Sequence, residues 1–181
     1  MIHLNESARK ELLKLARGSL DSYFATGKVG DTRPDRPELH QLAGAFVSLH
    51  RGDELRGCIG LIEPEGPLYR TVQRCAVSAA VEDFRFDPVT ADELPEIKIE
   101  ISVLSALKVA DNISEIKVGK HGLYMVRGHR RGLLLPQVAT DYGWDRESFL
   151  TQTCHKAGLS GDAWRDPATA IYLFEAQVFS E

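Results

Sequence analysis

Residues 43–62 read AGAFVSLHRGDELRGCIGLI, two apolar segments separated by Gly52-Asp53. A glycine in the first position of a two-residue turn suits type II′ geometry, so we expect a hairpin of residues 43–50 with residues 55–62. The pairs counted outward from this turn are Arg51–Glu54, Leu49–Arg56 and Val47–Cys58. On this register Arg56 and Cys58 share one face of the second strand, and His50 lies on the other.

The second strand of this hairpin carries LRGCIG at residues 55–60, where Gly57 and Gly60 flank a single thiol. Glycine inside a strand gives up side-chain packing and costs conformational entropy. Two interpretations follow: a neighbouring backbone comes close to the strand, or a ligand reaches Cys58. The sequence leaves both open.

The other elements follow from apolar periodicity and from turn and capping residues. A helix is expected from about Asn5 to Ala25, and a second one starts with Pro67 at its first position. Thr90 and Glu93 form a capping-box pattern. The remaining expected elements are a strand at 97–103, a hairpin of 123–127 with 132–135 across GHRR, a helix from Asp145 capped near Gly158, and a closing strand at 170–179.

This order of elements predicts an α+β fold, an antiparallel sheet with flanking helices. The hairpins are mixed with helices that do not alternate regularly with strands, which argues against a doubly wound parallel sheet. The 181 residues are enough for a single domain, which can also divide into two small lobes.

Composition limits the partners. The 22 basic and 26 acidic residues give a net charge of −4, so binding to nucleic acid or anionic lipid would need a local basic patch. No apolar run approaches the ~18 residues of a membrane span, and the N-terminal residues lack the apolar core of a signal peptide. Three widely spaced cysteines make no disulfide framework, so we expect free thiols in a reducing cytosol.

Residues 55–60, LRGCIG, resemble the hallmark hexapeptide of the AMMECR domain family, whose bacterial and archaeal members are called AmmeMemoRadiSam system protein A. The resemblance covers nearly the whole chain. Its other segments are DFRFDP at 83–88, IEISVLS at 99–105, HGL at 121–123, GLLLPQVA at 132–139, Trp144 with the helix at 149–156, and Gly158-Leu159.

The resemblance implies a mixed α+β fold of two interleaved lobes, over residues 1–181, with a cleft near the hexapeptide. It also implies functional association with a Memo-like protein and a radical SAM protein. It implies no particular reaction.

Cys58 has two interpretations. As a core residue it would pack among apolar strand residues, and burial would raise the pKa of its thiol. As a nucleophile it would use Arg56 on the same face to favour the thiolate, while Gly57 and Gly60 leave space for a substrate. Glu100, on the outward face of the strand at 97–103, would complete a cluster with Cys58 and Arg56 if it lies opposite Arg56; the alternative is a carboxylate covered by solvent.

Other polar residues are secondary candidates. If Cys58 is a nucleophile, His121, at the entry to a strand, is the expected general base; the alternative is a turn histidine hydrogen-bonded to the backbone. The run from Arg127 to Arg131 is expected as a solvated turn, with an anion contact through Arg131 as the alternative. Asp83 and Arg85 are expected to form a local ion pair or to fix the turn between them.

The cysteines and histidines lack metal-ligand spacing, so no metal site is expected, and nothing identifies a nucleotide or flavin cofactor. Cys75 and Cys154 fall on apolar helix stripes and are expected in the core. No aromatic residues interleave the basic run, so no nucleic-acid partner is expected.

Two function classes remain. In the first, the chain is an enzyme or enzyme component whose cleft presents Cys58 to a small molecule, with Arg56 as the anchor for an anionic group. In the second, it is a non-catalytic binding partner of the Memo-like or radical SAM protein.

Overall fold

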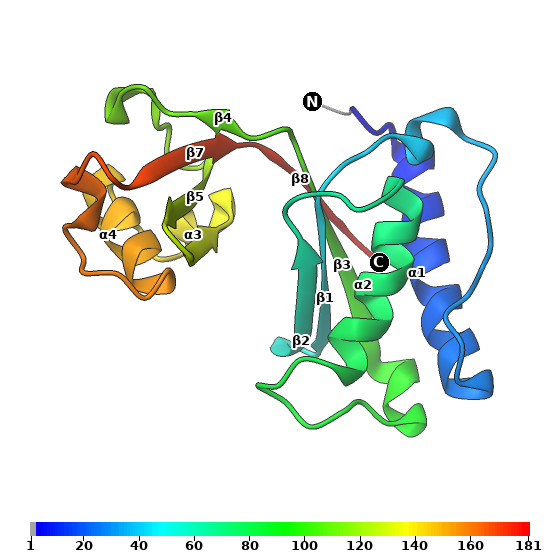
Figure 1. The fold of residues 1–181 in the computed structure, drawn as a ribbon. Coiled ribbons are helices and arrows are strands. Elements are labelled where there is room, and N and C mark those ends of the chain that lie inside the picture. Colours follow the sequence, from blue (N-terminus) through cyan, green and yellow to red (C-terminus); the bar gives the residue numbers. More distant parts are fainter. Residues whose placement is uncertain (1–2) are drawn as a thin grey trace. The chain divides into compact units, whose positions relative to one another are not determined.

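The structure is a computed structural model that describes residues 3–181. The chain divides into two compact units (Figure 1). The first contains the residues up to Leu104 together with Gln177–Glu181, and the second is Ser105–Ala176. The last strand therefore returns the chain to the unit in which it began.

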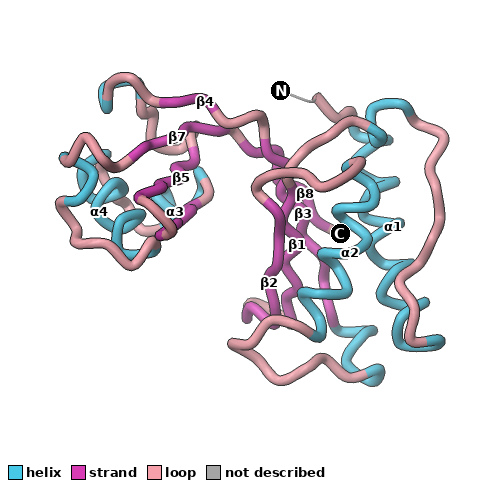
Figure 2. Tube along the Cα trace, viewed as in Figure 1, coloured by secondary structure: helices cyan, strands magenta, loops and turns pink. Residues whose placement is uncertain are grey.

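The first unit is an antiparallel sheet with helices packed on one face (Figure 2). Its strand order is β2-β1-β3-β8, which leaves β2 at one edge. Its elements are α1 (Glu6–Thr26), the 3₁₀ helix η1 (Pro37–His40), β1 (Ala45–Arg51), β2 (Glu54–Leu61), α2 (Leu68–Val81), the 3₁₀ helix η2 (Ala91–Glu96), β3 (Ile97–Leu104) and β8 (Ala176–Ser180).

Strand alternation determines which face of this sheet the helices cover. Val47 and Leu49 of β1 are fully buried, as are Ile99 and Ile101 of β3, and they pack into one core with apolar residues of α1 and α2. The intervening residues of both strands point to the opposite face. The site described below lies on that second face.

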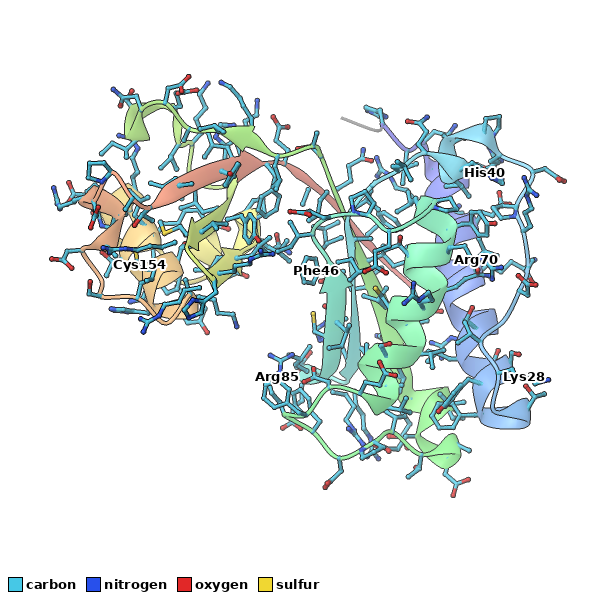
Figure 3. All side chains as sticks on the ribbon, in the orientation of Figure 1. Lys28, His40, Phe46, Arg70, Arg85 and Cys154 are labelled. Atoms are coloured by element: carbon cyan, nitrogen blue, oxygen red, sulfur yellow. The ribbon has the colours of Figure 1, made fainter. Side chains whose placement is uncertain are left out.

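The second unit is a separate antiparallel sheet with its own core, in strand order β4-β7-β5-β6. Its elements are β4 (Lys108–Val109), the 3₁₀ helix η3 (Ile113–Glu115), β5 (Gly122–Arg127), β6 (Arg130–Leu134), α3 (Pro136–Asp141), α4 (Arg146–Lys156), the 3₁₀ helix η4 (Ala163–Arg165) and β7 (Ala170–Phe174). Cys154, on α4, is fully buried in this core (Figure 3).

The expected α+β class with antiparallel sheets is confirmed, and most local signals are found where they were expected. The side chain of Asn5 caps α1 by accepting the backbone N–H of Ala8. Both hydrogen bonds of the Thr90–Glu93 capping box are present. The side chain of Asp145 caps α4 by accepting the backbone N–H of Ser148.

Three predicted boundaries are wrong. Pro67 is the N-cap of α2, and Leu68 is its first residue. The turn of the second hairpin is Gly128-His129, so Arg130 and Arg131 belong to β6. The expected strand at 170–179 is two strands, β7 and β8, which lie in different sheets. Periodicity along a chain does not report which partner a strand pairs with, so it cannot detect this change of sheet.

Among the described residues, no helix is both long and apolar enough to cross a membrane.

Candidate functional site

A β-bulge in the first hairpin sets the geometry around Cys58. Arg51 pairs with Glu54 as expected, but Leu49 pairs with Gly57 and Ser48 pairs with Cys58. The predicted pairs Leu49–Arg56 and Val47–Cys58 are therefore wrong. The extra residue on β2 is Arg56, and it shifts every later pair by one position.

The shifted register changes the neighbours of the thiol. Residues directly opposite each other in a sheet point to the same face, so Cys58 shares its face with Ser48. Ser48 also pairs with Glu100 of β3, and His50 lies two residues along β1. His50 is thus on the face of Cys58, contrary to the expectation. The result is a row of polar residues across the sheet, on the face opposite the helices.

Cys58 itself is half-buried and carries a free thiol. The Ser48 hydroxyl donates a hydrogen bond to its sulfur at 3.2 Å. Burial raises the pKa of the Cys58 thiol above its ordinary value, and Ser48 together with the Arg85 guanidinium offsets that rise only in part. The nearby carboxylates of Asp83 and Glu100 raise the pKa further. Cys58 is therefore protonated at neutral pH.

Asp83 and Arg85 occupy the exposed edge of β2 beside Cys58. One oxygen of the Asp83 carboxylate accepts the backbone N–H of Cys58 at 2.8 Å, and Nη2 of Arg85 donates to the Cys58 carbonyl at 3.3 Å. Edge strands otherwise present such groups unpaired to other chains. This ion pair thus takes the position that a neighbouring strand would fill.

The two side chains of this ion pair make two hydrogen bonds to each other, and they differ in solvent exposure. Nε and Nη2 of Arg85 donate to the two Asp83 oxygens at 2.9 and 2.6 Å. These bonds hold the pKa of Asp83 well below its usual range, although burial opposes the shift. The Asp83 side chain is 3% exposed and that of Arg85 is 42% exposed. Figure 3 shows Arg85 beside β2, away from α1.

Arg56 has a different environment from the expected one. Its guanidinium forms a two-pronged ion pair with Glu93, at 2.9 and 3.1 Å. It also donates to the carbonyls of Asp87 and Pro88 at 2.6 and 3.3 Å. Four contacts satisfy most of its five N–H donors and tie β2 to the segment after α2. Arg85 is instead the arginine that contacts Cys58.

Backbone and ring packing account for both glycines of the hexapeptide. A β-carbon on Gly57 would lie 2.0 Å from the carbonyl oxygen of Ala79 on α2. A β-carbon on Gly60 would lie 2.3 Å from the ring of Phe46, its partner on β1. Of the two interpretations of LRGCIG, close approach of neighbouring groups therefore explains the glycines.

The two remaining candidates lie in the second unit. His121, at the entry to β5, borders a cavity of about 150 Å³ together with Glu115 and Glu175. Its Nδ1 accepts the backbone N–H of Lys117 at 3.3 Å, so Nε2 carries the proton of the neutral ring. Burial lowers the pKa of His121, and Glu175 opposes that shift. Arg131 is exposed on β6.

Sequence reasoning missed Ser48 and the contact of Arg85 with Cys58. Ser48 has no signal of its own, because its place beside the thiol depends on the bulge. The sequence pattern identifies Arg85 only as a partner of Asp83. The resemblance did place residues 83–88 among the characteristic segments, which is the one signal that could have connected them to the hexapeptide.

No cluster of three or more His, Cys, Asp or Glu side chains within residues 3–181 is arranged to hold a metal ion. Cys75 and Cys154 are buried, as expected for core cysteines.

Comparison with known proteins identifies the family of this chain. The sequence profile of AMMECR1 matches residues 13–179, which is nearly the whole chain. The chain belongs to the AMMECR1 family. The hexapeptide, the Asp83–Arg85 pair and Glu100 all lie within the matched range.

Archaeal relatives of this AMMECR1-family chain extend over almost its full length. A protein of Methanothermobacter thermautotrophicus is 45% identical to this chain, and the alignment covers 98% of this chain and 96% of that protein. Protein MK0488 of Methanopyrus kandleri is 45% identical over 94% of this chain and 86% of its own length. The crystal structure of uncharacterized protein PH0010 from Pyrococcus horikoshii superposes with a TM-score of 0.90 at 41% identity, covering 94% of this chain and 90% of that one.

Proposed function

We propose that this AMMECR1-family protein is an enzyme component that holds a small anionic molecule beside the Cys58 thiol. The observation that carries the proposal is the position of the Arg85 guanidinium, which contacts the Cys58 carbonyl and is 42% exposed. Within the described residues, Nη1 of Arg85 has no hydrogen-bond partner, so its two N–H groups are free to bind a carboxylate or phosphate.

The thiol in this proposal acts from its protonated form. Burial keeps the pKa of Cys58 above its ordinary value, so a base must remove the proton before the sulfur attacks a substrate. His50 and Glu100 are titratable groups that the strand register places on the same sheet face. We propose them as candidate bases. The reaction would take place in a reducing cytosol, where the thiol stays free.

We propose that the chain acts with a Memo-like protein and a radical SAM protein, as its family resemblance implies. The second candidate function is a non-catalytic role within the same assembly. It is favoured by the packing that accounts for Gly57 and Gly60 and by the raised pKa of Cys58. Phe84, 94% exposed next to Arg85, would then be an apolar contact for the partner protein.

Ligand-induced thermal stabilisation tests the enzyme proposal. The wild-type chain is screened against small carboxylates and phosphates, and each stabilising compound is repeated on Arg85→Gln and Cys58→Ser. Arg56→Gln would be a poor control for the loss of an arginine, because Arg56 holds β2 to the segment after α2. Arg74→Gln is the better control, because it removes the same charge from an exposed arginine of α2.

The enzyme proposal expects stabilisation that Arg85→Gln abolishes and Arg74→Gln preserves. It also expects Cys58→Ser to remain folded but inactive in the assembled system. The non-catalytic alternative expects no stabilising ligand and full function in Cys58→Ser. It further expects that Phe84→Ser weakens co-purification with the Memo-like or radical SAM protein.

A further inference from the structure

The tip of the β5–β6 hairpin brings two like charges together. Arg127 and Arg130 are directly opposite each other, on either side of the two-residue turn Gly128-His129. Gly128 has φ +60°, which allows the strands to reverse there without strain. Like charges directly opposite on a sheet destabilise it unless something compensates them.

Only one of the two arginines has an acidic partner. Nη2 of Arg127 contacts the Asp166 carboxylate at 2.6 Å. Nη1 of Arg130 donates to the carbonyl oxygen of Gly158 at 2.5 Å, and no carboxylate within residues 3–181 pairs with this arginine. The Gly158 carbonyl orients the Arg130 side chain but does not neutralise its charge.

This partly compensated charge faces a hollow in the surface of the second unit. The hollow has a volume of about 530 Å³ and lies between the hairpin tip and the chain after α4. It is lined by Arg127, Gly128, His129, Arg130, Leu159 and Ser160. No acidic side chain is among these residues. Arg131 follows Arg130 on the strand and so points to the opposite face of β6.

We propose that this hollow is a binding site for the phosphate group of a small ligand. The guanidinium of Arg130, already oriented by Gly158, supplies a planar pair of N–H donors, which is the arrangement that binds phosphate oxygens. Arg127 adds positive charge, and His129 and Ser160 line the same hollow with further polar side chains. The phosphate supplies a negative charge to Arg130, which has no acidic partner among residues 3–181.

A small phosphate ligand fits this site better than a nucleic acid does. Proteins that follow a nucleic-acid backbone use extended basic grooves, and those that bind single strands interleave aromatic side chains for base stacking. The lining here contains no aromatic residue other than the His129 imidazole. The chain as a whole is also acidic, with a net charge of −4.

A titration of the full chain with inorganic pyrophosphate, followed by ¹H–¹⁵N NMR, tests the site. We expect saturable shifts confined to residues 127–131 and 158–161. Arg130→Gln should weaken the affinity at least about tenfold, because a charged, two-pronged contact is lost. Arg74→Gln, with the same charge change on an exposed arginine of the first unit, should leave the affinity unchanged.

Thermal unfolding separates a ligand-binding role from a purely structural one. Arg130→Gln relieves the like-charge pair, so the variant should unfold at a temperature no lower than that of the wild type without ligand. Pyrophosphate should raise the unfolding temperature of the wild type and of Arg74→Gln but not that of Arg130→Gln.

Two results would overturn the proposal. One is a set of shifts spread over the surface of both units, equal in Arg130→Gln and Arg74→Gln, which would mean non-specific charge screening. The other is a short single-stranded RNA that binds the same residues far more tightly than pyrophosphate does, which would assign the patch to a nucleic-acid backbone. Neither result bears on Cys58 or Arg85, so this proposal fails or survives independently of the proposed function.

Discussion

The carboxylate of Asp83 accepts the backbone N–H of Cys58 at 2.8 Å while it also holds the Arg85 guanidinium. The end of α2 is thereby fixed to the edge of β2 at the residue that carries the thiol. One buried carboxylate thus satisfies a strand edge and positions the proposed anion anchor.

Replacing Asp83 should destabilise the first unit. Asp83→Ala leaves the N–H of Cys58 without its partner and removes the ion pair, so we expect a loss of about 2–3 kcal/mol in the free energy of unfolding. Urea denaturation measures it. Glu65→Ala, which breaks the exposed pair with Arg74, should cost less than about 0.5 kcal/mol. Equal losses in the two variants would contradict the assigned role of Asp83.

The pair of Arg56 with Glu93 should contribute to stability against acid. The contact lowers the pKa of Glu93 from 4.5 to about 2 in the folded chain. A carboxyl group whose pKa is lower in the folded chain than in the unfolded chain stabilises the fold at pH values above the unfolded-state pKa. That contribution to the free energy of unfolding is lost as the pH falls from about 5 toward 2. Unfolding measured between pH 7 and pH 2 should therefore show a shallower decline in Glu93→Gln. An unchanged slope would mean that the pair adds nothing.

Two glycine-to-alanine substitutions should act in opposite directions. Gly57→Ala places a methyl group 2.0 Å from the Ala79 carbonyl, so α2 must move away from the sheet, and we expect a loss of about 2–4 kcal/mol. Gly18→Ala lies in the middle of α1 with nothing within 4 Å, so it should stabilise by about 0.5–1 kcal/mol. Thermal unfolding compares them, and a well-tolerated Gly57→Ala would refute the close approach.

Alkylation rates should distinguish the three cysteines. Cys58 is half-buried, whereas Cys75 and Cys154 are buried, and burial raises the pKa of Cys75 to about 11. We expect Cys58 to react first in the native chain, with a midpoint above the free-thiol value of ~8.5. Mass spectrometry from pH 5 to 10 checks this. A midpoint well below that value would restore an activated thiolate as the resting state.

The same measurement on Arg85→Gln isolates the effect of the guanidinium. Arg85 lowers the pKa of Cys58, so its loss should move the alkylation midpoint further upward. Arg56→Gln should not do so directly, because the Arg56 guanidinium is engaged with Glu93. A larger shift in Arg56→Gln than in Arg85→Gln would favour the register that the sequence first predicted.

Local sequence signals predicted most elements because each depends on residues close together in the chain. The caps at Asn5 and Asp145 and the Thr90–Glu93 box involve contacts three residues apart. The alternation of Ile97, Ile99 and Ile101 likewise identified the buried face of β3 without knowledge of its partners.

The candidate site was predicted less well, because its geometry depends on one unpaired residue. The bulge at Arg56 leaves the residue types of the hairpin unchanged but moves Cys58 from opposite Val47 to opposite Ser48. A register counted without the bulge therefore places Arg56 beside the thiol in place of Arg85, and it places His50 on the face opposite Cys58. A sequence count from the turn cannot detect a bulge, since the strands on both sides of it still alternate normally.

By itself, then, the sequence determined the α+β class, the order of the elements, the buried faces of the helices and the hexapeptide around Cys58. Only the folded chain showed that Asp83 and Arg85 close the edge of β2 and that Ala79 and Phe46 require the two glycines. It also showed that residues 170–179 divide between two sheets. The first set depends on contacts within a few residues, while the second depends on backbone groups that meet only after distant segments pack together.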